Sequence, residues 1–170
     1  MVSSKILIGD AEIQLMHEPC VDPDSYRHKN IFIESSSAEN NTLSTIIFND
    51  YLTIYVFWEH CSSGVSQEIL YVPETGVLFI GCGSISARVS TREQKLIDVN
   101  SVALFWSFDR HENYVLETGE IECFLYSLSG NKIAKAVVDP PYETYFTEKG
   151  IRFESDFYGS TWLYYSDENM

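Results

Sequence analysis

The alternation of apolar and polar positions is clearest in residues 114–138, where two glycine-containing turns separate three short runs. In the middle run Ile121, Cys123 and Leu125 alternate with glutamates, which is the period of a β-strand with one buried face. From residue 124 onward, apolar side chains occupy both sides of this run. The pattern therefore predicts a strand that lies inside a sheet, with its far half covered on both faces.

Similar runs continue along the chain, and turn-forming residues interrupt them about every 8 to 12 residues. This spacing is typical of all-β folds, and no stretch has the period of an amphipathic helix. We expect hairpins over residues 6–15, 43–58 and 67–80, and polar loops over residues 17–30, 35–42 and 109–113. The expected fold class is all-β: an antiparallel two-sheet sandwich or open barrel built from hairpins, with partial propeller-like blades as the alternative.

The domain organisation follows from length and composition. A chain of 170 residues with 45% hydrophobic content suits one domain with a substantial core. Residues 51–58 are apolar on both sides, so this strand is expected in the middle of its sheet. We expect a single β domain over residues 1–165 and a disordered tail over residues 166–170.

Two internal similarities suggest related units. The hexapeptide Tyr-Val-Pro-Glu-Thr-Gly at residues 71–76 recurs as Tyr-Val-Leu-Glu-Thr-Gly at residues 114–119, which is a spacing of 43 residues. The tripeptides Gly-Ser-Ile at residues 83–85 and Gly-Glu-Ile at residues 119–121 are instead 36 residues apart. The chain therefore contains either a true repeat or two similar hairpin units.

The segment Leu-Tyr-Ser-Leu-Ser-Gly-Asn-Lys-Ile at residues 125–133 runs from a strand through a glycine turn into lysine and an apolar residue. It resembles the outer hairpin of a blade in quinoprotein-type β-propellers, and the resemblance covers residues 119–138. Ile133 stands where that family usually has an aromatic residue. A closed propeller would need four blades of ~40 residues, and the first 50 residues show none, which favours two packed sheets.

A second resemblance rests on residues spread over the same half of the chain. They are Phe105, Trp106, Arg110, His111, Glu120, Glu122, Gly130, Lys132 and the Asp-Pro-Pro-Tyr run at residues 139–142. Together they resemble a group of uncharacterised bacterial proteins that carry no assigned activity. This resemblance implies no chemistry.

The formal net charge is −14, with 25 Asp and Glu against 11 Lys and Arg. Nucleic acids and anionic membranes are therefore excluded as expected partners, whereas a basic protein would be attracted. The same charge is also what solubility alone would require. The chain starts without a signal-peptide core and has no run of ~18 apolar residues, so we expect a cytoplasmic protein.

Four cysteines, Cys20, Cys61, Cys82 and Cys123, form no Cys-x-x-Cys pair and are expected to be free thiols. The pairs His17-x-x-Cys20 and His60-Cys61 offer ligand types that zinc prefers. Neither pair has a matching partner motif, so no metal and no cofactor are expected.

One cluster with possible chemistry follows Trp106. Asp109, Arg110 and His111 place an acid, a guanidinium and an imidazole between two runs, and a carboxylate can orient a histidine that acts as a general base. The same residue types are common in any solvated hairpin loop.

A second cluster contains the carboxylates Glu117, Glu120 and Glu122. Two carboxylates could catalyse glycoside hydrolysis, with tryptophan and tyrosine rings as sugar platforms. Acids alternating along a strand are also the ordinary polar side of a half-buried sheet.

The absence of any catalytic signature favours a non-catalytic binding module over an enzyme. The leading hypothesis is a bacterial immunity or inhibitor protein that acts by protein–protein interaction with a basic partner. The alternative is a small-ligand or carbohydrate-binding protein, or a glycoside-active enzyme. The candidate binding residues are Trp106, Asp109, Arg110, His111, Glu120 and Glu122.

Overall fold

The computed structural model describes residues 2–60 and 67–165 of the chain. Within these ranges the protein consists of 16 strands joined by turns and loops, without a helix. The expected all-β fold of antiparallel hairpins is confirmed. The hairpins are distributed over four sheets, none of which closes into a barrel.

The first sheet has the strand order β1-β2-β4-β5-β3. Its strands pair antiparallel, except that the short edge strand β3 runs parallel to β5. The hairpin between β4 and β5 turns over the three residues 49–51, in which Asn49 and Asp50 have positive φ angles of 47° and 58°. The strands are β1 (Val2–Ile8), β2 (Ala11–Pro19), β3 (Phe32–Glu34), β4 (Thr42–Phe48) and β5 (Leu52–Trp58).

The other three sheets are antiparallel meanders, in which strands that follow one another in sequence are hydrogen-bonded neighbours. The second sheet contains β6 (Glu68–Val72), β7 (Val77–Cys82), β8 (Ile85–Ser90) and β9 (Lys95–Ser101). The third contains β10 (Phe105–His111), β11 (Tyr114–Gly119), β12 (Glu122–Ser127) and β13 (Lys132–Val137). The fourth contains β14 (Tyr142–Phe146), β15 (Gly150–Ser155) and β16 (Gly159–Tyr164).

These three meanders recur at a constant spacing along the chain. Their first strands begin at Glu68, Phe105 and Tyr142, and each start lies 37 residues after the previous one. The strands β8, β12 and β16 keep the same spacing. Residues 37 positions apart in the second and third sheets therefore occupy equivalent places.

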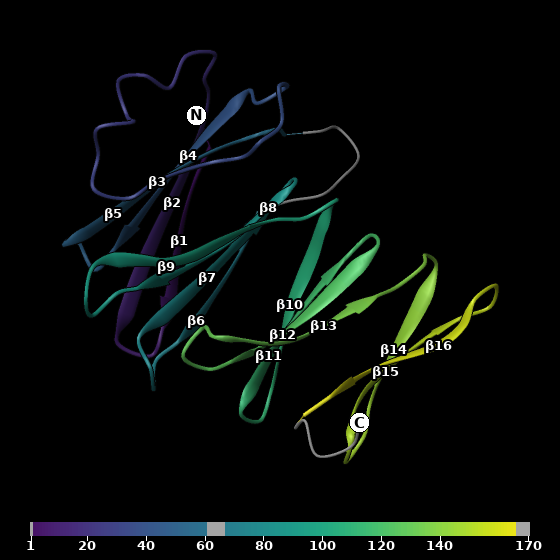
Figure 1. The fold of residues 1–170 in the computed structure, drawn as a ribbon. Coiled ribbons are helices and arrows are strands. Elements are labelled where there is room, and N and C mark those ends of the chain that lie inside the picture. Colours follow the sequence, from purple (N-terminus) through teal and green to yellow (C-terminus); the bar gives the residue numbers. More distant parts are fainter. Residues whose placement is uncertain (1, 61–66, 166–170) are drawn as a thin grey trace.

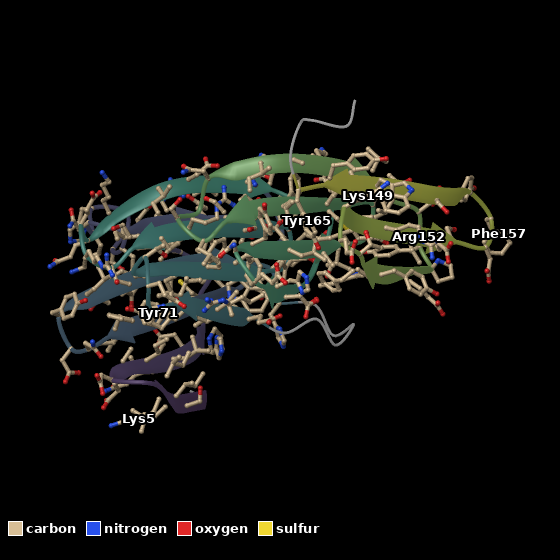
Figure 2. All side chains as sticks on the ribbon, turned by 90° about the horizontal axis from the view of Figure 1, so that it is seen from below. Lys5, Tyr71, Lys149, Arg152, Phe157 and Tyr165 are labelled. Carbon is tan, nitrogen blue, oxygen red and sulfur yellow. The ribbon has the colours of Figure 1, made fainter. Side chains whose placement is uncertain are left out.

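The four sheets stack face to face in sequence order. Figure 1 follows them from the purple N-terminal sheet to the yellow C-terminal one, and Figure 2 shows the first and fourth sheets at opposite ends. One hydrophobic cluster lies between each consecutive pair of sheets, with Ile80 in the first, Phe79 and Tyr126 in the second, and Leu125 and Phe153 in the third. Consecutive meanders that pack in this way form a β fold of several stacked sheets.

The central strand predicted in the third sheet is confirmed. β12 lies between β11 and β13, and Cys123, Phe124, Leu125 and Tyr126 are all buried. The prediction for Ile121 was wrong, because this side chain is 48% exposed. Residues 120 and 121 turn the chain, and the alternation of faces starts only where β12 begins.

Two expected loops are shorter than predicted. β10 continues through Asp109, Arg110 and His111, and the turn consists only of Glu112, with φ 49°, and Asn113. β2 extends into the expected loop at residues 17–30 and ends at its first proline. Both segments pair fully with a neighbouring strand, and this pairing outweighs their polar composition.

The hexapeptide similarity does not mark equivalent elements. Residues 71–76 end β6 and form the following turn, whereas residues 114–119 are all of β11. The 37-residue spacing agrees instead with the 36-residue similarity to within one residue. The Gly-x-Ile similarity therefore relates the second sheet to the third, whereas the hexapeptide similarity relates no equivalent strands.

Two further expectations concern the limits of the domain. The described residues contain no helix that is long and apolar enough to cross a membrane. The tail predicted at residues 166–170 lies outside the described residues.

We expect Leu125→Ala to lower the free energy of unfolding by about 2–5 kcal/mol, because it removes buried contacts and leaves a cavity between the third and fourth sheets. Ile121→Ala is the control, and its effect should stay below about 1 kcal/mol since the side chain is exposed. Denaturant melts of both variants measure the difference. Equal losses would contradict the described orientation of β12.

Candidate functional site

The structure places Trp106 on β10 with 38% of its surface exposed. Its ring stacks on Tyr142 of the fourth sheet, with centroids 5.2 Å apart and an interplanar angle of 16°. Trp106 is therefore part of the contact between the third and fourth sheets and is only partly available to a ligand.

The cluster at the end of β10 is divided between two neighbours. Arg110 makes a two-pronged contact with Glu74 of the second sheet, at 2.6 and 3.2 Å. His111 packs against Phe146 of the fourth sheet, with ring centroids 4.6 Å apart. Asp109 forms no hydrogen bond with His111 among the contacts of the described residues, so the structure does not assemble a histidine oriented by this carboxylate.

The three glutamates of the second cluster lie in three environments. Glu120 is exposed in the turn before β12, and Glu122 forms an ion pair with Lys135 on the neighbouring strand. Glu117 is buried against the second sheet, with 1% of its surface exposed. The structure therefore does not place a pair of accessible carboxylates around a substrate.

The described metal-ligand candidates do not gather at one place. His17 Nδ1 lies 2.8 Å from Ser44 Oγ, which also accepts a hydrogen bond from Trp58 Nε1 at 2.8 Å. Cys20 is an unpaired thiol, as are Cys82 and Cys123, and no group of three or more ligand side chains gathers in the described part of the chain. Cys61, and with it the pair His60-Cys61, lies outside the described residues.

A buried polar network between the second and third sheets was missed by the sequence analysis. Arg88 and Tyr126 are fully buried, and Arg88 Nη1 donates to Tyr126 OH at 3.2 Å. Arg88 Nη1 also lies 3.3 Å from Ser86 Oγ, which donates to Glu117 Oε2 at 2.6 Å. Arg88 Nη2 pairs with the half-exposed Asp98, so the network reaches from the core to the surface.

The electrostatics of this network are unusual for a protein core. Burial raises the pKa of Glu117, although Ser86 and Arg88 both favour its charged form. Glu117 Oε1 and Arg88 Nε have no hydrogen-bond partner among the described residues. Burial also raises the pKa of Tyr126 well above its usual range.

The 37-residue spacing shows what the network replaces. Arg88 occupies the place that Leu125 has in the third sheet, and Glu117 the place that Ile80 has in the second. Both Leu125 and Ile80 are buried apolar residues. Since Glu117 is inaccessible, we interpret the network as a polar contact that fixes how the two sheets pair, rather than as a site for a ligand.

The outer face of the fourth sheet is the second feature that was missed. Tyr145, Arg152 and Trp162 lie directly opposite one another across β14, β15 and β16. The Arg152 guanidinium carbon lies 5.0 Å from the centre of the Tyr145 ring and 5.9 Å from that of Trp162. Tyr164 stacks beside Trp162, with centroids 5.9 Å apart. We call these four residues the aromatic face.

The aromatic face occupies positions that the other sheets bury. The corresponding cross-strand pairs are Phe79 with Arg88 in the second sheet and Leu116 with Leu125 in the third. All four of those side chains are fully buried under the next sheet. Arg152 and Trp162 form the corresponding pair of the fourth sheet, and Trp162 is 36% exposed.

Comparisons with known proteins add little to this description. No family model matches the chain, and no curated protein matches it. Among solved structures, Hsv2 of Kluyveromyces lactis matches 61% of this chain with 10% sequence identity and a TM-score of 0.33, and the match covers 35% of that protein. This similarity is too low to carry an argument, so the two resemblances drawn from the sequence stay predictions.

The raised pKa of Glu117 predicts a pH-dependent stability. Because the folded state holds this proton above the ordinary pKa of 4.5, its stabilising contribution is complete below that value and is lost as the pH rises. Relative to Glu117→Gln, the wild type should lose up to about 1.4 kcal/mol of unfolding free energy per pH unit between pH 4.5 and the raised pKa of folded Glu117. Denaturant melts of both proteins from pH 4.5 upward measure this difference. Parallel pH profiles would show that Glu117 titrates normally.

Proposed function

We propose that this protein is a non-catalytic binding module that docks onto a basic protein through the aromatic face of its fourth sheet. The observation that carries the proposal is the partial exposure of aromatic and arginine side chains on one face of the fourth sheet. At the equivalent positions of the second and third sheets, a following sheet covers the side chains completely. At the fourth sheet, the described residues leave Arg152 and Trp162 partly accessible.

The chemistry of the aromatic face suits a protein partner. Tryptophan, tyrosine and arginine are the residue types that contribute most often to binding energy at protein interfaces. Arg152 also forms an ion pair with Glu154 at 3.0 Å, so a partner would not have to bury an uncompensated charge. The outward side of a solvated sheet is usually polar, which makes this surface distinct.

The competing carbohydrate hypothesis is less well supported by the same residues. Sugar platforms need open ring faces, and here the guanidinium of Arg152 lies between Tyr145 and Trp162. The glutamates proposed for glycoside chemistry are separated by burial and ion pairing. These observations favour protein binding over sugar binding and over catalysis.

The charge of the chain supports the choice of a basic partner. A formal net charge of −14 attracts cationic proteins and accelerates their association. A cytoplasmic immunity or inhibitor protein that neutralises a basic toxin of bacterial origin combines these properties. This role remains the one we propose for the module.

We expect affinity purification to recover a basic protein whose calorimetric affinity falls as the salt concentration rises, because charge attraction is screened. Trp162→Ala should weaken this binding at least about tenfold, while its loss of packing on Arg152 and Tyr164 lowers the free energy of unfolding by about 0.5–3 kcal/mol and leaves the protein folded. Calorimetry of the variant against the same partner measures the first effect, and denaturant melts measure the second.

The matched control is Tyr51→Ala, which truncates a half-exposed aromatic residue in the β4–β5 turn, away from the fourth sheet. Its affinity should equal that of the wild type. Equal losses in both variants, recovery of no partner, or binding that is indifferent to salt would contradict the proposal. Binding on a glycan array that depends on Trp162 would favour the carbohydrate alternative instead.

A further inference from the structure

A pocket of about 200 Å³ lies between the third and fourth sheets, on the opposite side of the fourth sheet from the aromatic face. Val138 and Asp139 line it where the chain leaves β13. Phe153 and Tyr158 line it from the end of β15 and from the following turn. Tyr142, at the start of β14, completes the aromatic part of its wall.

Its size restricts what the pocket can hold. Sites for drug-sized ligands usually measure about 300–1,000 Å³, so this one is too small for most metabolites. One long side chain or one small organic cation is a better match. The pocket is therefore suited to a single group that projects from a larger partner.

The wall of the pocket is fixed before any ligand binds. The Tyr142 hydroxyl donates to Gly119 O at 2.7 Å, and its ring stacks on Trp106. Phe153 meets the Tyr142 ring edge to face, with centroids 5.7 Å apart and an angle of 85°. Two of the three aromatic rings are thus held by the packing of the third and fourth sheets.

The charge of the pocket indicates which kind of group binds. Asp139 is exposed and forms no ion pair with any of the described cationic side chains. The Asp139 carboxylate and the exposed ring of Tyr158 form a combination that attracts an organic cation, while Tyr142 and the buried Phe153 supply apolar contacts. A neutral or anionic group would gain only the apolar contacts.

We propose that this pocket binds an alkylammonium group, supplied by a lysine side chain of the basic partner. The inference rests on the proposed function for the identity of the partner, but the pocket chemistry can be tested without it. The turn between β15 and β16 carries the exposed Phe157 and Tyr158, and Figure 2 shows Phe157 at the outer tip of the fourth sheet. A partner that reaches around this tip would contact both the pocket and the aromatic face.

The test uses blocked lysine, Nα-acetyl-lysine N-methylamide, titrated into the full chain and followed by NMR shifts of the pocket residues. The matched probe is the norleucine analogue, which has the same chain without the ammonium group. Blocked lysine should bind at least about tenfold more tightly than the norleucine analogue, and added salt should reduce this ratio.

Variants of the pocket separate charge from shape. Asp139→Asn and Tyr158→Ala should each weaken the binding of blocked lysine several-fold, whereas Tyr158→Phe should retain it because the ring is kept. Both positions are exposed, so melts of all three variants should match the wild type. Equal binding of the two probes, no binding of either, or unchanged binding by Asp139→Asn would overturn the inference.

The two proposals fail in different ways. If the pocket ignores lysine but Trp162→Ala abolishes partner binding, the proposed function holds and this inference is wrong. If blocked lysine binds as expected but no protein partner is recovered, the pocket is an alkylammonium site and the proposed function is wrong.

Discussion

The structure depends on one constraint, which is that a sheet with apolar side chains on both faces must be covered on both sides. Every described residue of β7 and β8 is buried, and most of β12 is as well. A single two-layer sandwich leaves one face of each sheet in water, so it cannot satisfy such strands. The chain solves this by repeating a meander every 37 residues and stacking each on the one before. Among the described residues, no further sheet covers the aromatic face of the fourth sheet.

The interface between the second and third sheets differs from the other two in what holds it together. Apolar interfaces tolerate alternative pairings because any apolar surface of similar shape can replace another. A buried arginine and glutamate do not, since each loses its hydrogen-bond partners in the wrong arrangement. Arg88 and Glu117 are bonded to each other through Ser86, which joins β8 to β11. We infer that the network contributes more to the choice of pairing than to the total stability.

Much of the strand pattern could be predicted because the side-chain period is local. The alternation around Cys123 and Leu125 identified a central strand, and the turn at Asn49 and Asp50 identified a hairpin. The number of sheets could not be predicted, because periodicity does not say which element covers a face. Glu117 was read as one of several outward acids, since its burial depends on Ser86 and Arg88 of another sheet. The polar composition at the end of β10 predicts a loop. The structure shows a strand there, because Arg110 binds Glu74 of the second sheet and His111 packs on Phe146 of the fourth.

The exposure of the aromatic face could not be predicted from the sequence either. Tyrosine and tryptophan on a strand are usually core residues, so the sequence does not distinguish Trp162, which is open, from Leu125, which is covered. The aromatic face and the pocket, on the two sides of the fourth sheet, also differ in the charge of the partner group that suits them. Arg152 is already paired with Glu154, so the aromatic face can lose its water without an added counter-ion. Asp139 has no such partner among the described residues, so a group that enters the pocket gains attraction to this carboxylate when it carries a positive charge. A partner that binds both surfaces therefore needs an apolar or aromatic patch next to a cationic side chain. Because the aromatic face and the pocket lie on opposite sides of the fourth sheet, the patch and the cationic side chain must be far enough apart to reach around the β15–β16 turn.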